Sequence, residues 1–111
     1  MRPGSHEFEA TRSGDRVDAT LSGELDMSAT FRLEPELERV TQQPGVRTLV
    51  LDMGGVEFID SAGLGLLLAT HERLRAEQVR FALANPSRSV RRIIDLAGAA
   101  ETLAVTAEPA A

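Results

Sequence analysis

The first part of the chain alternates weakly between apolar and polar residues. Two such segments, 7–13 and 16–22, are separated by the dipeptide Gly14-Asp15. The apolar residues that share one face of the second segment are Val17, Ala19 and Leu21. A period of two residues is typical of strands with one buried face, and a two-residue connection of this kind is typical of hairpins. The pattern therefore predicts an N-terminal β-hairpin.

A helical period follows the hairpin. Its apolar stripe is made up of Phe31, Leu33, Leu37 and Val40. Asp26 and Ser28 are both residue types that cap helices, and the element ends at about Gln42. Pro35 leaves two alternatives open. Either the helix begins at Ser28 and is kinked by an interior proline, or a short turn comes first and the regular helix begins near Pro35 as its first residue.

The segment 47–52 has a continuous apolar centre, Leu49-Val50-Leu51, which favours a central strand with parallel neighbours. We expect a loop over 54–59, and then a helix from Ser61 to about Glu77. The remaining predicted elements are a strand over 79–84, a helix over 87–97 closed by Gly98, and a short strand over 103–106. Strands that alternate with helices predict an α/β fold, with a mixed, mostly parallel sheet of about four to five strands and helices packed alongside.

Composition limits the function classes. The chain has 111 residues, a net charge of -5 and only four aromatic residues, all Phe. One domain with one core is expected at this length, and an acidic surface without stacking rings argues against nucleic-acid binding. The chain has no Cys, and no segment approaches the ~18 apolar residues of a spanning helix. We therefore expect a cytoplasmic protein without membrane insertion, with residues 1–6 disordered, one domain over 7–106 and a short tail over 107–111.

The most informative stretch is the predicted junction of strand, loop and helix around Ser61. Residues 60–65 read Asp-Ser-Ala-Gly-Leu-Gly, and we interpret Ser61 as the N-cap of the helix that follows. Two glycines, Gly63 and Gly65, then fall in the first helical turn, where each costs roughly 1 kcal/mol relative to Ala. Either something approaches this backbone closely, or the glycines only pack against the sheet.

The residues that would make Ser61 an enzymatic nucleophile are missing. A nucleophilic serine needs a base, usually His. His6 falls in the predicted disordered start, and His71 lies roughly 15 Å from Ser61 at 1.5 Å per helical residue. No His or Cys accompanies the nearby carboxylates at metal-ligand spacing, and the glycines lack the Lys of a phosphate-binding loop. We predict that the protein is not an enzyme and has no catalytic residue, metal or cofactor.

A serine that accepts phosphate needs fewer neighbouring groups than a nucleophilic serine, because a separate kinase supplies the catalytic groups. The requirement on Ser61 is that its hydroxyl be exposed. The free N–H groups and the dipole of a helix N-terminus favour an attached phosphate. Modification would add a charge of about -1.5 to -2 beside Asp60. The sequence therefore predicts that phosphorylation changes what the surface binds without unfolding the domain.

The run 60–65 resembles the phosphorylation motif of the bacterial anti-sigma factor antagonists, small proteins built from a STAS domain. Residues 23–26, Gly-Glu-Leu-Asp, are similar to a second block of that family. Residues 85–87 and 91–98 are similar to its third helix and the turn after it. The resemblance covers about residues 8–106 and implies a STAS fold. We expect the additional C-terminal helix that is usual in that family to be absent or vestigial, because only residues 107–111 follow the region of resemblance.

The resemblance also implies a switch between partners. The unphosphorylated protein would bind a serine-kinase anti-sigma factor and free a sigma factor. Phosphorylation of Ser61 would release the protein, and a metal-dependent serine phosphatase would restore it. The partner-binding residues implied in this way are Asp26, Met27, Ser28, Phe58, Asp60, Ala62, Gly63, Leu64 and Gly65.

Two other functions stay open. The chain could be a STAS subunit that regulates or assembles a membrane transporter without a phosphorylation switch, with Ser61 only a cap, or a scaffold of a signalling complex. Asp26 could likewise serve only as a helix cap. The three basic residues at i, i+3 and i+4 are Arg88, Arg91 and Arg92. They predict a solvated helix face in which Arg91 pairs with Asp95.

Overall fold

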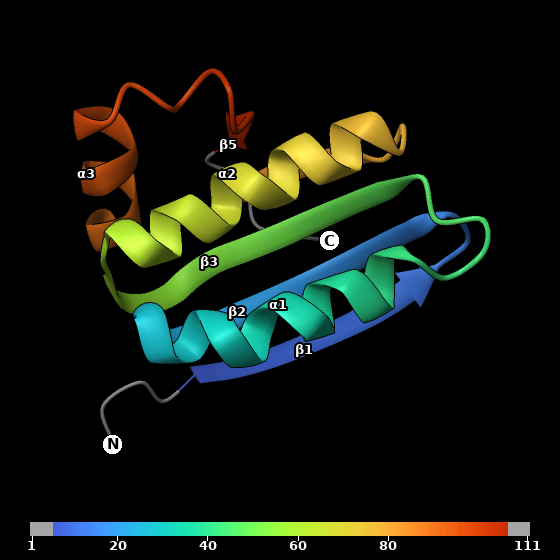
Figure 1. Cartoon of the computed structure of the whole chain (residues 1–111), viewed down its shortest axis with the longest axis horizontal. Helices are drawn as coiled ribbons and strands as arrows, with labels where there is room; N and C mark the ends of the chain where they lie inside the picture. Colours follow the sequence, from blue (N-terminus) through green and yellow to red (C-terminus); the bar gives the residue numbers. More distant parts are fainter. Residues whose placement is uncertain (1–5, 107–111) are drawn as a thin grey trace.

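The computed structural model describes residues 6–106, and it contains one five-stranded sheet in the order β1-β2-β3-β4-β5 (Figure 1). Strands β1 (His6–Ser13) and β2 (Arg16–Leu25) form an antiparallel hairpin, and every other pair of neighbouring strands is parallel. The other elements are α1 (Met27–Thr41), β3 (Thr48–Ile59), α2 (Ser61–Ala76), β4 (Arg80–Ala84), α3 (Arg88–Leu96) and β5 (Val105–Thr106). The predicted mixed, mostly parallel sheet with an N-terminal hairpin is confirmed.

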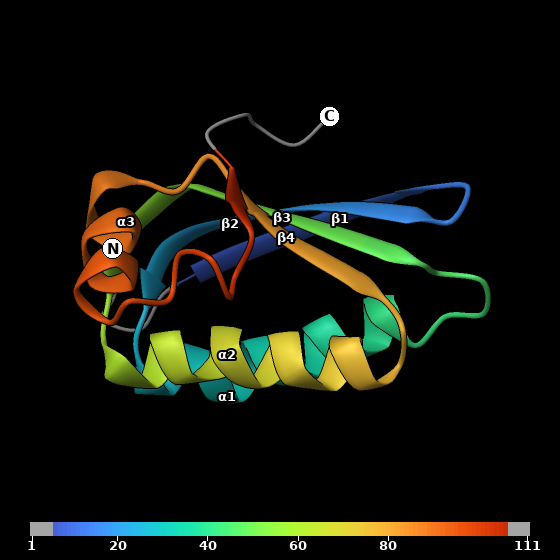
Figure 2. The same ribbon diagram turned by 90° about the horizontal axis from the view of Figure 1, so that it is seen from above.

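Helices α1 and α2 lie side by side on one face of the sheet (Figure 2). Most of the core lies between these two helices and the strands, and Val90 and Ile94 of α3 are also part of it. Its fully buried leucines include Leu21, Leu25, Leu33, Leu37, Leu49, Leu51, Leu67, Leu74 and Leu83. Val17 and Ala19 are also buried, as their alternation predicted. Burial of each such side chain contributes about 1.5–3 kcal/mol, so this two-layer packing is the main source of stability.

Helix α1 begins at Met27 and contains Pro35 in its interior, so of the two alternatives the one with the early helix start is correct. The predicted stripe is wrong at Phe31, which is 75% exposed. Ala29 takes its place beside Leu33, Leu37 and Val40. Positions 29, 33, 37 and 40 recur every three or four residues, whereas Phe31 is displaced from Leu33 by about 200° around the helix. The exposed phenyl ring therefore points away from the sheet.

Strand β3 continues to Ile59, so the prediction of a loop over 54–59 is wrong. Val56 and Ile59 are buried and pair with Gly23 and Leu25 of β2, across two register shifts. The adjacent glycines suggested a turn. The partner strand instead continues alongside and satisfies the backbone of this segment, which single-sequence patterns do not reveal. As a result β3 leads directly into α2.

The ends of the other elements agree closely with the sequence analysis. Ser87 caps α3, and Gly98 follows that helix with a φ of 68°. The Arg91–Asp95 pair forms at 3.2 Å. The last strand is shorter than predicted. His6 is the first residue of β1 rather than part of a disordered start, and the predictions for residues 1–5 and 107–111 lie outside the described residues.

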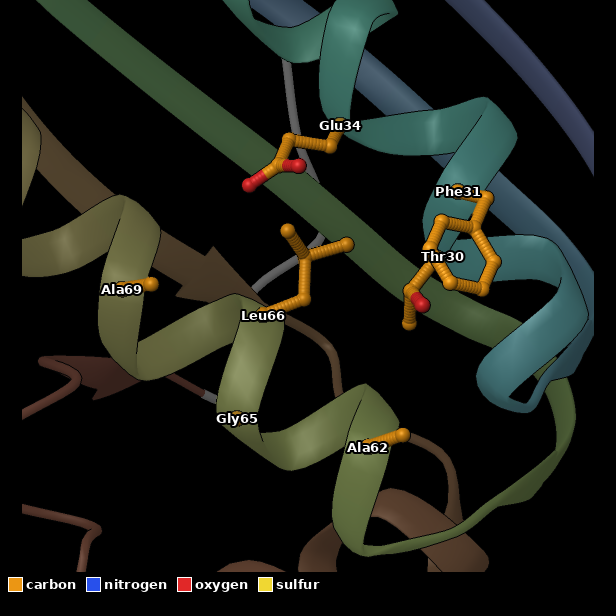
Figure 3. A pocket seen from close by; sticks show the side chains of 7 residues that line it. All are labelled: Thr30, Phe31, Glu34, Ala62, Gly65, Leu66 and Ala69. Atoms are coloured by element: carbon orange, nitrogen blue, oxygen red, sulfur yellow. The ribbon is translucent and has the colours of Figure 1, made fainter.

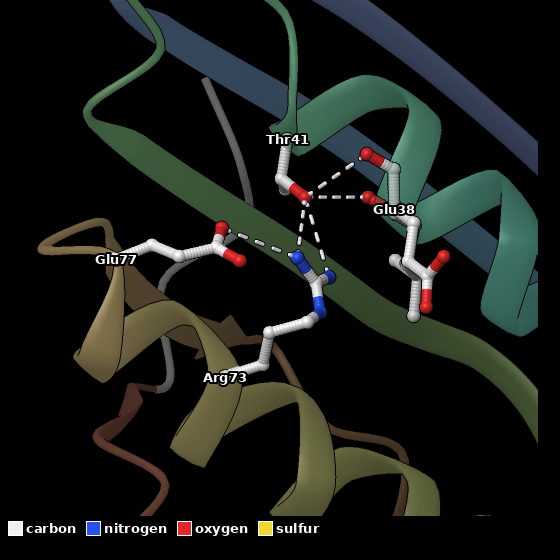
Figure 4. A network of polar contacts seen from close by, with 5 residues as sticks. Glu38, Thr41, Arg73 and Glu77 are labelled. Atoms are coloured by element: carbon white, nitrogen blue, oxygen red, sulfur yellow. Dashed lines mark hydrogen bonds and ion pairs between the residues drawn. The ribbon is translucent and has the colours of Figure 1, made fainter.

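A polar network joins α1 and α2 at the ends remote from Ser61 (Figure 4). Both terminal nitrogens of Arg73 donate to Thr41 Oγ1 at 3.3 Å, and Arg73 also pairs with Glu77 at 3.4 Å. The Thr41 hydroxyl donates to the Leu37 carbonyl at 2.7 Å. These bonds hold the two helices together at their C-terminal ends.

In the part of the chain that the structure describes, no helix combines the length and apolar character needed to cross a membrane.

Candidate functional site

The starts of α1 and α2 lie beside each other at the carboxyl edge of the sheet (Figure 1). Leu25 ends β2 and Ile59 ends β3, and the two residues are partners in the parallel pairing of these strands. Each is followed by an aspartate that begins a helix. The Asp60 N–H donates to the Leu25 carbonyl at 3.4 Å, which links the two junctions. This is the edge where functional residues gather in sheets of this type.

The N-cap of α2 is Asp60, so the interpretation of Ser61 as the cap is wrong by one residue. Asp60 has extended backbone angles, and its carboxylate accepts the Gly63 N–H at 3.0 Å. Both residues are of capping types, and the bond from Asp60 to Leu25 keeps Asp60 in the extended conformation that a cap requires. Ser61 is consequently the first helical residue of α2.

The side chain of Ser61 is exposed, and within residues 6–106 its hydroxyl has no hydrogen-bond partner. The first main-chain bond of α2 runs from Leu64 N–H to the Asp60 carbonyl at 3.0 Å. The N–H groups of Ser61 and Ala62 precede it and have no acceptor within the helix. An anion on Ser61 would meet these two donors. The Asp60 carboxylate lies at the same helix N-terminus, and its negative charge offsets part of the stabilisation that the helix dipole gives to an anion.

The two glycines of the motif have different surroundings. Gly63 is buried, and a Cβ at this position would overlap the Leu25 carbonyl oxygen and come within 2.9 Å of Ile59 Cγ1. Its role is close packing of α2 against the end of β2, and it leaves no open space for a partner. Gly65 is exposed, and a Cβ there would meet nothing within 4 Å. Of the two alternatives left open by the sequence, packing accounts for Gly63 but not for Gly65.

The structure brings most of the other predicted contact residues to the same edge. Met27 is 61% exposed and Phe58 is 48% exposed. Ser28 is exposed, whereas Ala62 and Leu64 are partly buried. These side chains come from the start of α1, the end of β3 and the first turn of α2, and they form a mixed apolar and polar surface around Ser61.

Asp26 has a structural role that the sequence analysis anticipated as an alternative. It is the N-cap of α1, and its carboxylate accepts the Ala29 N–H at 2.9 Å. Asp26 and Asp60 therefore place two carboxylates near Ser61.

Among the described residues no group of three or more His, Cys, Asp or Glu side chains is arranged to hold a metal ion.

A groove of about 260 Å³ runs between α1 and α2, directly beside this surface (Figure 3). It is lined by Thr30, Phe31, Glu34, Ala62, Gly65, Leu66 and Ala69. The sequence analysis missed it because Phe31 was assigned to the buried stripe. The available signal was the position of Phe31 between Ala29 and Leu33, off the face on which the other apolar residues of α1 recur.

The chain matches the family model described as the STAS domain over residues 7–109. An anti-sigma F factor antagonist of Lysinibacillus sphaericus is 32% identical over 84 residues, which cover 76% of this chain and 72% of that protein. An anti-sigma factor antagonist from Mycobacterium paratuberculosis has a crystal structure that is similar with a TM-score of 0.83 and 30% identity. That similarity covers 94% of this chain and 87% of the other.

The anti-sigma factor antagonist SpoIIAA is similar in an unphosphorylated and in a phosphorylated form. The unphosphorylated form has a TM-score of 0.75 and 28% identity, over 90% of this chain and 88% of that one. The phosphorylated form from Bacillus has a TM-score of 0.70 and 27% identity, over 90% of this chain and 91% of that one. Each of these similarities extends over most of both chains.

Proposed function

The chain belongs to the STAS domain family, and from this premise we propose that it is an anti-sigma factor antagonist controlled by phosphorylation of Ser61. The unphosphorylated protein binds a serine-kinase anti-sigma factor in the cytoplasm, and the bound anti-sigma factor releases its sigma factor. The kinase transfers the γ-phosphate of ATP to Ser61 Oγ, ADP leaves, and the modified protein dissociates. A metal-dependent serine phosphatase hydrolyses the phosphoester and restores the binding form.

The observation that carries this proposal is the state of the Ser61 side chain. Its hydroxyl is exposed, makes no hydrogen bond within residues 6–106, and is not needed as the cap of α2 because Asp60 fills that role. A kinase can therefore reach Ser61 without breaking any native interaction. The solved phosphorylated form of SpoIIAA supports such a modification in a related protein.

Charge explains how the modification can end binding without a change of fold. A phosphate adds about -1.5 to -2 charges to a surface that already holds Asp26 and Asp60. In the free domain, water and the N–H groups of Ser61 and Ala62 stabilise this charge. A partner surface that fits a neutral hydroxyl would have to desolvate the phosphate, which costs several kcal/mol.

The proposed contact surface keeps the residues predicted from the sequence, with one exception. Met27 and Phe58 supply exposed apolar contacts, Ser28 and Asp60 supply polar ones, and Gly65 leaves the α2 backbone open. Gly63 is removed from this surface because it is buried against Leu25. We infer that its place in the motif reflects packing.

Incubation with the candidate kinase and ATP, followed by mass spectrometry, tests the proposal. We expect one phosphate, located on Ser61, and no incorporation in Ser61→Ala. Ser13→Ala is the control, because Ser13 is an exposed serine at the end of β1, outside the proposed contact surface, and we expect it to be labelled like the wild type. Full labelling of Ser61→Ala would exclude Ser61 as the acceptor. A STAS subunit of a transporter would neither bind nor be phosphorylated.

A further inference from the structure

Gly65 occupies a place where the fold itself does not require glycine. It lies in the second turn of α2, where glycine is less favourable than alanine, and a Cβ would meet nothing within 4 Å. Gly63 has a packing reason, because a side chain there would overlap the Leu25 carbonyl. Gly65 has none, so the reason for its lack of a side chain must come from outside the domain. Gly65 lines the groove between α1 and α2.

The opposite wall of this groove carries an exposed aromatic ring. Phe31 is 75% exposed, and Figure 3 shows it on α1 across from Ala62 and Leu66 of α2. Leu66 is only 7% exposed and closes the bottom of the groove. The volume of about 260 Å³ is that of several water molecules at ~30 Å³ each, so the groove can accept a side chain. An apolar side chain would bury the ring of Phe31 as it enters.

The rim of the groove also carries a charge that is not neutralised. Glu34 projects from α1 toward the space beside Leu66 (Figure 3), and within residues 6–106 no cation pairs with it. The neighbouring caps Asp26 and Asp60 are acidic as well. A complementary partner therefore presents a Lys or Arg near the apolar side chain that it inserts.

We infer that this groove receives a segment of the serine-kinase anti-sigma factor that combines one apolar side chain with a neighbouring Lys or Arg. The inference rests on the proposed function and identifies a second part of the same contact surface. Ala62 belongs both to the groove and to the first turn of α2, so the two parts are continuous. Ser61 then controls whether the partner binds, and the groove determines which anti-sigma factor fits.

Three variants with matched controls test the groove, with the anti-sigma factor that phosphorylates Ser61 as the probe. Gly65→Leu fills the groove, and Ala76→Leu changes an exposed position of α2 outside it. Because glycine is the poorer helix former, Gly65→Leu should raise the melting temperature by about 3–6 °C. We expect it to weaken binding at least tenfold by titration calorimetry, whereas Ala76→Leu should bind within twofold of the wild type.

The other two variants remove one wall and reverse the charge at the rim. Phe31→Ala should weaken binding about tenfold, and Leu96→Ala, at a side chain that is 79% exposed on α3, should not. Glu34→Arg should also weaken binding about tenfold, with a smaller loss at 0.5 M salt. Glu9→Arg makes the same change in net charge at an exposed position of β1 and serves as its control.

These measurements separate failure of the groove from failure of the proposed function. If the wild type binds and is phosphorylated while all three groove variants bind within twofold of it, the proposed function stands and the inference is overturned. If the wild type neither binds nor accepts phosphate, both are overturned. A tenfold loss confined to the groove variants, with melting temperatures at or above the wild-type value for Gly65→Leu, supports docking in the groove.

Discussion

The starts of α1 and α2 are built on the same plan and differ at single positions. Each helix follows one of two paired strand ends and is capped by an aspartate, with cap distances of 2.9 Å for Asp26 and 3.0 Å for Asp60. The first helical residue is Met27 in α1 and Ser61 in α2. Because α1 begins without a hydroxyl at that position, the hydroxyl of Ser61 is not required to start a helix. The difference separates the structural part of the motif, Asp60, from the part available for chemistry.

At the third helical residue the structure restricts the residue type in α2 but not in α1. Ala29 and Gly63 occupy equivalent positions, and both are buried. A Cβ is accommodated in α1, but in α2 it would overlap the Leu25 carbonyl oxygen. Helix α2 therefore approaches the end of β2 more closely than a side chain permits, and here the structural requirement falls on the motif in α2.

The largest expected effect on stability is at this third position. Gly63→Ala should lower the free energy of unfolding by about 1–3 kcal/mol, because the added methyl group forces α2 away from Leu25 and Ile59. Ala29→Gly should cost about 1–2 kcal/mol, through lower helix propensity and the loss of a buried methyl group. Urea denaturation of both variants checks the comparison. A Gly63→Ala protein as stable as the wild type would show that the two helix starts are equivalent at this position.

Removal of either cap should cost a similar and smaller amount. Asp26→Ala and Asp60→Ala should each lower the free energy of unfolding by about 1 kcal/mol, since each leaves one backbone N–H without its acceptor. Asp60→Asn keeps a capping side chain and should cost only a few tenths of a kcal/mol. Thermal melts of the three variants test whether both helices depend on their aspartate caps. A loss of stability in only one of the two alanine variants would contradict this prediction.

The smallest effect should come from Ser61 itself. Ser61→Ala should change the free energy of unfolding by no more than about 0.5 kcal/mol, because the residue is exposed and is not the cap. A denaturation curve recorded beside that of Asp60→Ala distinguishes the two positions. A loss of about 1 kcal/mol in Ser61→Ala, with no loss in Asp60→Ala, would return the capping role to the serine.

The sequence was sufficient for the order and type of the elements because their periods are clear. The hairpin, the apolar segment at 47–52 and the helix after Ser61 all follow from local patterns. The end of β3 and the identity of the α2 cap did not, because both depend on contacts with β2. Ile59 pairs with Leu25, and Asp60 bonds to the Leu25 carbonyl. No local preference distinguishes Asp60 from Ser61 without that neighbour.

The candidate site, too, could be predicted from the sequence only in part. The motif at 60–65 identified the serine and its surroundings from sequence alone. The different roles of Gly63 and Gly65 depend on the rotation of α2 about its axis, which decides which glycine faces Leu25. The groove depends on how α1 and α2 pack together, and Phe31 lines it only because that ring lies on the outer side of α1.

The most direct test of the account compares purified phosphoprotein with unmodified protein in two measurements. Titration with the anti-sigma factor gives the affinity, and calorimetric melting gives the stability. We predict an affinity loss of roughly a hundred- to several-thousand-fold, corresponding to a desolvation cost of about 3–5 kcal/mol, with little change in melting temperature. A phosphoprotein that melts at a much lower temperature but binds with unchanged affinity would contradict the proposal that Ser61 acts through surface charge.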